Sequence, residues 1–119
     1  MAPTMIFYKN NDLMLITGSP GGSLIPAAIL RVISGVIDFN LDIGQATMLP
    51  RVHKDWPTTG ILYERTLNAD SINGIRKIGH KMTPEHTMGS TQSIHIKDGV
   101  NYGYADLRRP NASVATQAN

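Results

Sequence analysis

One segment limits the possible folds of this chain more than any other: residues 23–39 read SLIPAAILRVISGVIDF and have the spacing of a long helix. Arg31, Ser34 and Asp38 form a narrow polar stripe on it, and nearly every other position is apolar. A helix that is apolar almost all round is normally covered on most of its sides. We therefore expect the chain to be part of a larger layered protein; a tight α+β domain or a dimer that buries this helix is the alternative.

The rest of the chain predicts an α+β fold of short elements, with no repeats and no interdomain linker. Its clearest local signal is a hairpin of residues 92–97 and 100–104, in which Asp98-Gly99 supplies a type I′ turn. The other predicted elements are a hairpin of residues 4–9 and 13–17, a strand at 61–64, and helices at 42–48 and from Asn68 or Asp70 to Ile78. Ser23 and Asp42 are the predicted N-caps, residues 51–60 are predicted to be irregular, and residues 110–119 to be a frayed tail.

Composition excludes several classes of protein. The 119 residues carry a net charge of only +2 with both signs interleaved, so we expect no nucleic-acid partner. No uncharged apolar run reaches the roughly 20 residues of a membrane helix, so we expect no membrane partner either. The first residues, MAPTMIFYKNND, lack the pattern of a signal peptide. The absence of cysteine excludes disulfides and thiolate metal sites but leaves the compartment open.

The candidate site is the glycine pair Gly21-Gly22, which lies between a short apolar strand and the long helix. Bare backbone at a helix mouth presents N–H groups, and these together with the helix dipole favour negative charge. Two functional interpretations follow: a site for a small anion or phosphate, or an oxyanion hole for acyl transfer. SPGGSLI lacks the Lys-Ser/Thr of a Walker motif, and there is no GxGxxG. A tight strand-to-helix turn is the purely structural alternative.

Residues that could react beside such a turn are harder to find. There is no cysteine and no GxSxG elbow. The histidines lie in different elements without an i,i+4 pair, so we predict no metal site and no cofactor: His53, His80, His86 and His95. Asp106 and Arg108 could pair with each other or reach another part of a larger protein. Residue by residue, the chain therefore offers a possible oxyanion hole without a nucleophile.

Five segments, in order along the chain, resemble the C-terminal part of the small subunit of bacterial γ-glutamyltranspeptidases. They are MAPTMIFYKNNDLMLITGSPGGS, VIDFNLDIGQATMLPRVHKDW, IRKIGHKM, MGSTQSIHI and YGYADLRRP. Each motif alone is weak, but the collinear set covers nearly all of the chain up to about Pro110.

The resemblance implies an N-terminal-nucleophile hydrolase with an αββα four-layer sandwich. In that family an N-terminal threonine attacks the γ-glutamyl amide of glutathione, and the acyl-enzyme passes to water or to an amino acid. By position, Gly21 and Gly22 would supply the oxyanion-hole N–H groups and contact substrate there. Family members in bacteria are exported, which implies a periplasmic or secreted parent enzyme.

The resemblance also implies what this chain lacks. The nucleophilic threonine, the paired serines and the acidic residues that hold substrate all match positions upstream of Met1. Leu24, Val52 and Leu107 replace an arginine, an aromatic residue and a proline of the family pattern. We therefore expect residues 1–119 to be one C-terminal fragment that is inactive alone and partners the large subunit and the rest of the small subunit.

Two interpretations of another kind remain open at this point. The chain could be a stand-alone module whose glycine turn binds a carboxylate or phosphate without chemistry. It could also be a structural fragment that forms homo-oligomers through its apolar helix.

Overall fold

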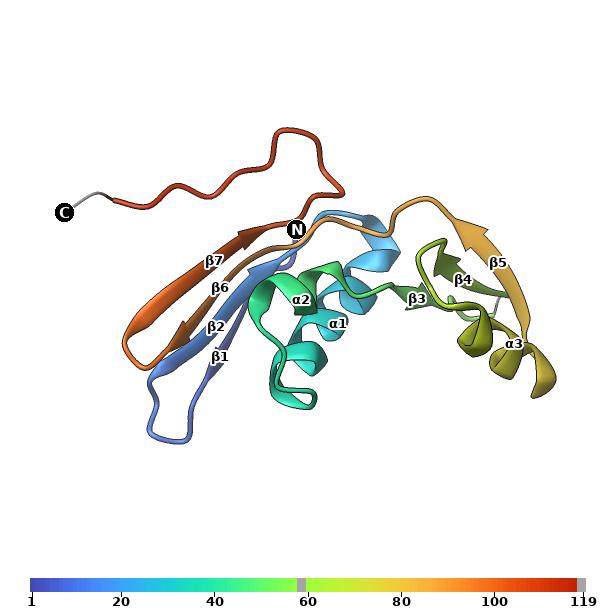
Figure 1. Cartoon of the computed structure of the whole chain (residues 1–119), viewed down its shortest axis with the longest axis horizontal. Coiled ribbons are helices and arrows are strands. Elements are labelled where there is room, and N and C mark those ends of the chain that lie inside the picture. Colours follow the sequence, from blue (N-terminus) through green and yellow to red (C-terminus); the bar gives the residue numbers. More distant parts are fainter. Residues whose placement is uncertain (58–59, 118–119) are drawn as a thin grey trace. The chain divides into compact units, whose positions relative to one another are not determined.

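The computed structural model describes residues 1–57 and 60–117, and its contacts group the chain into two compact units. Unit 1 comprises Met1–Leu49 and Gly89–Asn119, and unit 2 comprises the intervening Pro50–Met88 (Figure 1). Among the described residues, no helix combines the length and the hydropathy that crossing a membrane would require.

Unit 1 is built on a four-stranded antiparallel sheet in the order β1-β2-β6-β7 (Figure 1). Its strands are β1 (Thr4–Phe7), β2 (Leu13–Gly18), β6 (Gln92–Lys97) and β7 (Val100–Ala105). Both predicted hairpins are confirmed. Asp98 and Gly99 have φ angles of 52° and 74°, the positive values that a type I′ turn requires at both central positions.

Two helices, α1 (Ile25–Ile37) and α2 (Ile43–Met48), pack on one face of this sheet. Their shared core joins β2 to both helices and consists of Leu15, Val32, Val36, Ile43 and Ala46. The predicted start of α2 is confirmed as a capping box, in which the Asp42 carboxylate accepts the Gln45 N–H at 2.8 Å. Side chains alternate across the sheet, so Leu15 and His95 face the helices while Ile94 faces the other side.

The predicted N-cap at Ser23 is wrong. A short 3₁₀ helix, η1 (Gly22–Leu24), precedes α1, and the N-cap of α1 is Leu24, which forms no side-chain capping bond. Pro26 does lie in the first turn of α1, where its missing N–H costs nothing. The chain therefore tightens after the glycine pair and only then becomes an α-helix.

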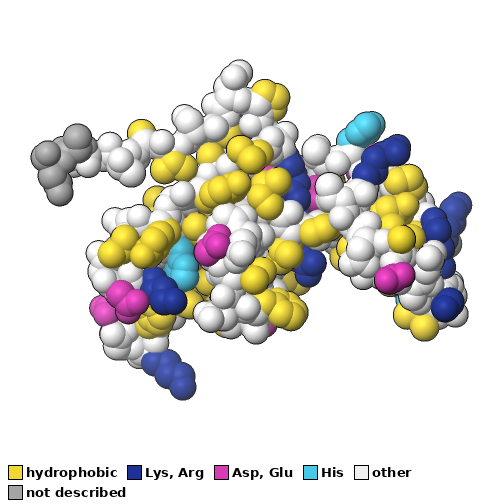
Figure 2. Space-filling view, in the orientation of Figure 1, with side chains coloured by type: hydrophobic (Ala, Val, Ile, Leu, Met, Phe, Trp, Pro, Cys, Tyr) yellow, Lys and Arg dark blue, Asp and Glu magenta, His cyan; other side chains and the backbone are white. Residues whose placement is uncertain are grey.

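Part of α1 and the residues after it remain uncovered. Leu30, Ile37 and Phe39 are 65%, 46% and 64% exposed. Figure 2 shows hydrophobic side chains gathered on the face where α1 and α2 lie. A single unit with so much apolar surface on its main helix agrees with the expectation that further layers cover it.

Unit 2 contains a three-stranded sheet in the order β3-β4-β5. Its elements are β3 (Val52–His53), β4 (Gly60–Glu64), α3 (Ala69–Lys77) and β5 (Lys81–Glu85). The predicted strand and helix are confirmed, and Asn68 caps α3 by accepting the Ser71 N–H at 2.8 Å. β4 and β5 are parallel, and α3 forms the crossover between them.

Two strands of unit 2 contradict the sequence expectations. β3 lies inside the segment 51–60, for which the sequence predicts irregular structure, and β5 has no counterpart among the predicted elements. In β5 only Met82 is buried, so the polar sequence KMTPE lacks a strand-like apolar pattern. Residues 58–59 of the first segment, and residues 118–119 of the predicted tail, lie outside the described residues.

Hydrogen bonds between two buried charged side chains and the backbone hold unit 2 together. Arg51 and Glu64 are 1% and 2% exposed. The Glu64 carboxylate accepts the N–H groups of Arg51 and Met88 at 3.0 and 2.9 Å, and Nη1 of Arg51 donates to the Met88 carbonyl at 2.7 Å. These hydrogen bonds join Arg51, the second residue of the unit, to Met88, its last residue, through Glu64 of β4.

The described part of the predicted tail, residues 110–117, has no helix or strand. Val114 lies against β7: a Cβ added to Gly103 would be only 2.8 Å from a Val114 methyl carbon. Because Gly103 is paired with Ile94, this contact is on the sheet face that α1 and α2 leave open.

Candidate functional site

The glycine pair lies at the end of β2, where the chain leaves the sheet and enters η1 and α1. Gly21 has φ 136° and ψ 17°, and Gly22 has φ 59°. Side chains are strained at such positive φ angles, so the turn depends on glycine at both positions. Both residues are exposed, as a site that meets a ligand must be.

The carbonyl groups of this turn are occupied while its donors are not. The Pro20 carbonyl accepts the Ser19 hydroxyl at 2.7 Å, and the Gly21 carbonyl accepts the Leu24 N–H at 3.1 Å. Among the described residues, neither the Gly21 N–H nor the Gly22 N–H has an acceptor. Two neighbouring main-chain N–H groups, both without an acceptor in the described part of the chain, therefore lie at the start of η1, directly before α1.

Such donors suit a negative charge. Aligned peptide dipoles place partial positive charge at the start of a helix, and α1 has no acidic residue in its first turn that would neutralise it. Fixed donors that meet developing oxyanion charge need no reorganisation during the reaction. The chemistry of the turn therefore fits a carboxylate, a phosphate or a tetrahedral oxyanion.

A second segment, far away in sequence, packs against the turn. The Ser90 N–H donates to Ser19 Oγ at 3.0 Å. Gly89 has φ 72°, and a Cβ added to Gly21 would lie 3.3 Å from the Gly89 Cα. The sequence alone does not connect Ser90 to the glycine turn, because nothing local indicates a contact across 71 residues.

The predicted pair of Asp106 and Arg108 forms within unit 1. Arg108 Nη1 lies 3.1 Å from Asp106 Oδ1, and Asp106 is fully buried. The same carboxylate accepts the Thr91 N–H at 3.0 Å, and Arg108 donates to the carbonyls of Thr47 and Leu49 at 2.9 and 3.1 Å. This pair fastens the end of β7 to the end of α2, which is a structural task.

The histidines do not assemble into a catalytic or metal-binding group. No cluster of three potential metal ligands is found within residues 1–57 and 60–117. His53 Nε2 contacts Asp55 Oδ1 at 2.8 Å in unit 2. Burial, and secondly the charge of Lys97, hold the pKa of His95 below its ordinary value of 6.5, which favours the neutral form of this side chain.

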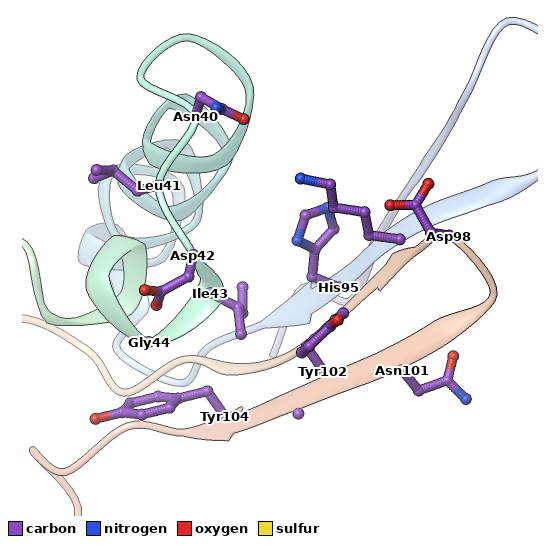
Figure 3. Close-up of a pocket in the computed structure, with 12 residues that line it drawn as sticks. Asn40, Leu41, Asp42, Ile43, Gly44, His95, Asp98, Asn101, Tyr102 and Tyr104 are labelled. Atoms are coloured by element: carbon purple, nitrogen blue, oxygen red, sulfur yellow. The ribbon is translucent and has the colours of Figure 1, made fainter.

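His95 borders a cavity of about 760 Å³, shown in Figure 3. Asp42 and Tyr104 line it from α2 and β7, and Tyr102 and Asp98 from the β6–β7 hairpin. The cavity lies toward the hairpin turn, whereas Gly21 and Gly22 follow the other end of β2, where Gly18 pairs with Gln92. It is therefore separate from the glycine turn.

Taken together, the fold and the turn define an α+β protein in which two exposed main-chain N–H groups precede the long helix α1. The family model described as Gamma-glutamyltranspeptidase matches residues 1–116. The chain belongs to the γ-glutamyltranspeptidase family. Enzymes of this family are N-terminal-nucleophile hydrolases, so the predicted family and fold class are both confirmed.

Curated relatives are glutathione hydrolase proenzymes. The chain is 37% identical over 109 residues to that of Escherichia coli (strain K12), covering 91% of this chain and 19% of the relative. It is 31% identical over 117 residues to that of Bacillus subtilis (strain 168), covering 96% of this chain and 20% of the relative. The chain thus spans about a fifth of the length of the relatives it matches.

Solved structures agree with this assignment. A mutant of Helicobacter pylori γ-glutamyltranspeptidase superposes with a TM-score of 0.85 at 37% identity, over 92% of this chain and 61% of that chain. The enzyme from Pseudomonas nitroreducens complexed with L-DON superposes with a TM-score of 0.86 at 25% identity, over 98% of this chain and 62% of that chain.

Proposed function

We propose that this chain supplies the oxyanion hole of an enzyme that transfers or hydrolyses the γ-glutamyl group of glutathione through a γ-glutamyl-threonine intermediate. The N–H groups of Gly21 and Gly22 would donate to the oxygen of the γ-carbonyl as it becomes negatively charged. The single observation that carries the proposal is the pair of exposed N–H groups without an acceptor in the described structure, in a turn whose φ of 136° at Gly21 requires glycine.

Family membership supports the choice of an acyl-transfer oxyanion over other anions. The same geometry would also hold a free carboxylate or phosphate, because donors at a helix mouth do not distinguish these by charge alone. A γ-glutamyl enzyme needs such donors only where a tetrahedral intermediate forms, and their stabilisation of that intermediate raises the rate.

The proposal includes partners and a location. The chain spans about a fifth of its relatives, with 19% of the Escherichia coli protein covered, which supports a larger assembly. In our proposal the large subunit and the remainder of the small subunit provide the nucleophilic threonine and the groups that hold the substrate. The complete enzyme would be periplasmic or secreted, and residues 1–119 alone would be inactive.

The first test uses the chain by itself. Release of 4-nitroaniline from its γ-glutamyl derivative is expected to stay at the rate without protein. An oxyanion hole with no nucleophile retains little catalytic power for this reaction. Turnover clearly above that rate would show that residues 1–119 contain their own nucleophile and would overturn the proposed inactivity.

The second test uses a complete enzyme that carries this chain as its C-terminal part. Gly22→Val should lower turnover by about 10²–10³-fold, the usual loss when one oxyanion donor is displaced. Nothing lies within 4 Å of a Cβ built at Gly22, so the effect would come from the backbone at φ 59° and not from a clash.

Gly99→Val is the matched control for this substitution. Gly99 also has positive φ, at 74°, with open space around its Cβ, but it belongs to the β6–β7 hairpin turn. This variant should keep nearly full turnover. Equal turnover of the Gly22→Val and Gly99→Val enzymes would refute the oxyanion role.

A further inference from the structure

We propose that Ser19 is a positioning residue that fixes the direction of the Gly21 N–H. The inference rests on the proposed oxyanion role of Gly21 and adds a residue that touches neither substrate nor the reacting atoms. It follows from the contacts of one fully buried hydroxyl group.

Ser19 Oγ forms two hydrogen bonds whose directions are determined. It accepts the Ser90 N–H at 3.0 Å, since a backbone N–H can only donate. It donates its single proton to the Pro20 carbonyl at 2.7 Å, since a carbonyl oxygen can only accept. The hydroxyl therefore links the segment after Gly89 to the peptide group that joins Pro20 to Gly21.

That peptide group also carries the Gly21 N–H. A peptide bond is planar and trans, so its C=O and its N–H point in opposite directions. When Ser19 holds the Pro20 carbonyl toward the buried side, the Gly21 N–H must point away from it, toward solvent and an incoming oxyanion. The hydrogen bond from Ser19 to the Pro20 carbonyl thus also orients the Gly21 N–H, which belongs to the same peptide plane.

The peptide plane between Pro20 and Gly21 needs the hydrogen bond from Ser19, because the turn is otherwise flexible. Glycine has no Cβ and explores far more of φ,ψ space than other residues, so Gly21 on its own does not hold an orientation. Gly89 packs beside the same hydroxyl and carbonyl: a Cβ at Gly89 would lie 2.6 Å from Ser19 Oγ and 3.2 Å from the Pro20 oxygen. A Cβ at Gly21 would in turn lie 3.3 Å from the Gly89 Cα. The hydrogen bond from Ser19 and this close packing together leave the peptide plane little freedom.

The second donor is held independently of Ser19. The Gly22 N–H belongs to the next peptide plane, whose carbonyl, that of Gly21, accepts the Leu24 N–H at 3.1 Å within the turn that opens η1. Loss of the Ser19 hydroxyl should therefore disturb the Gly21 N–H and leave the Gly22 N–H in place. This contrast separates positioning from a general loss of structure.

The first test measures the orientation of both N–H bonds in the ¹⁵N-labelled chain by residual dipolar couplings. In Ser19→Ala, the coupling of Gly21 should change well beyond experimental error while that of Gly22 stays at its original value. Ser93→Ala is the control, since it removes another buried hydroxyl, one that is hydrogen bonded to Thr17 Oγ1 at 2.7 Å. It should leave both couplings unchanged.

An unchanged Gly21 coupling in Ser19→Ala would overturn the inference, and so would equal changes in Ser19→Ala and Ser93→Ala. If Ser19→Ala does not fold, Ser19→Cys serves the same purpose, because it keeps nearly the same volume with a much weaker donor. The dipolar coupling of Gly21 should change in Ser19→Cys too, and an unchanged value would also overturn the inference.

The second test is kinetic and uses the complete enzyme. Ser19→Ala should lower kcat about tenfold, less than the loss of a whole donor, because a rotated N–H retains part of its interaction. KM should stay constant, since the donor acts mainly in the transition state. Ser93→Ala should leave both kcat and KM near their original values.

The two proposals fail in different ways. If Gly22→Val keeps full turnover, the oxyanion role is wrong, whereas the coupling measurements on Ser19→Ala still report whether the hydroxyl orients the Gly21 peptide. If Gly22→Val loses turnover and Ser19→Ala does not, the oxyanion role stands and the positioning role of Ser19 is refuted.

Discussion

Replacing Gly89 by alanine tests how tightly the glycine turn is packed against the segment that follows unit 2. A Cβ at this position would lie 2.6 Å from Ser19 Oγ, 3.1 Å from the Ala28 Cβ and 3.2 Å from the Pro20 carbonyl oxygen. The first of these distances is far inside van der Waals contact. The Pro20 carbonyl oxygen belongs to the backbone and Ala28 to helix α1, so neither can move away from the new Cβ without a loss of stability. The glycine turn itself must therefore shift.

The expected loss in unfolding free energy has two parts. The backbone at φ 72° costs an L side chain roughly 1–2 kcal/mol. The overlap adds the cost of overpacking a filled space, about 1–3 kcal/mol. Gly99→Ala isolates the first part, because Gly99 has nearly the same φ of 74° and nothing within 4 Å of its Cβ.

Gly89→Ala should therefore be less stable than Gly99→Ala by about 1–3 kcal/mol. Urea titrations followed by the amide signal of Leu15 report on unit 1 specifically, since this residue is fully buried in its core. The comparison requires equal m-values in the two variants. Equal midpoints would refute the reasoning, because they would mean that the space between Gly89 and Ser19 is not filled as described.

Two further predictions concern buried charge and titration. Arg51→Met should lower the unfolding free energy of unit 2 by about 1–3 kcal/mol, because the buried Met88 carbonyl loses the Nη1 donor that lies 2.7 Å away. Urea titration on the Met82 amide measures this loss, and a loss below about 0.5 kcal/mol would contradict the network. His95 makes stability depend on pH: burial and Lys97 lower its pKa in the fold, so the unfolded chain binds the proton more readily and stability falls as pH drops below about 6.5. His95→Gln should weaken this dependence between about pH 7.5 and about pH 5, and an unchanged slope would argue against it.

Elements with a strong local code were predicted correctly. The β6–β7 hairpin follows from Asp98-Gly99, which accepts positive φ at both central positions. Helix α2 follows from Asp42, whose carboxylate satisfies the Gln45 N–H. In each case the residues that decide the structure are within a few positions of one another.

Elements that depend on residues distant in the sequence were not predicted correctly. β5 is a strand because it pairs with β4 across the α3 crossover, and its sequence KMTPE contains nothing that favours a strand on its own. The η1 turn displaced the predicted cap at Ser23, because the glycine pair opens with 3₁₀ geometry instead of an α-helical turn.

The same distinction between local and distant contacts applies to the residues of the candidate site. Gly21 and Gly22 could be proposed from the sequence, because paired glycines directly before a helix bring bare backbone N–H groups to the start of that helix. Ser19 could not, because a single serine in a strand end is ordinary, and its partner, the Ser90 N–H, is 71 residues away. The importance of such a residue becomes visible only when the carbonyl that it holds is traced to the donor on the same peptide plane.

The bond between Arg51 and the Met88 carbonyl also has an entropic consequence. It closes a loop whose ends are 37 residues apart, and closing a loop of that length costs about 3 kcal/mol of chain entropy. Once unit 2 is folded, the contacts within it have already offset this loss of chain entropy. The two segments of unit 1, which end at Leu49 and resume at Gly89, are then joined as if by a short connection. Unit 2 can therefore vary in length without weakening the sheet that carries the glycine turn.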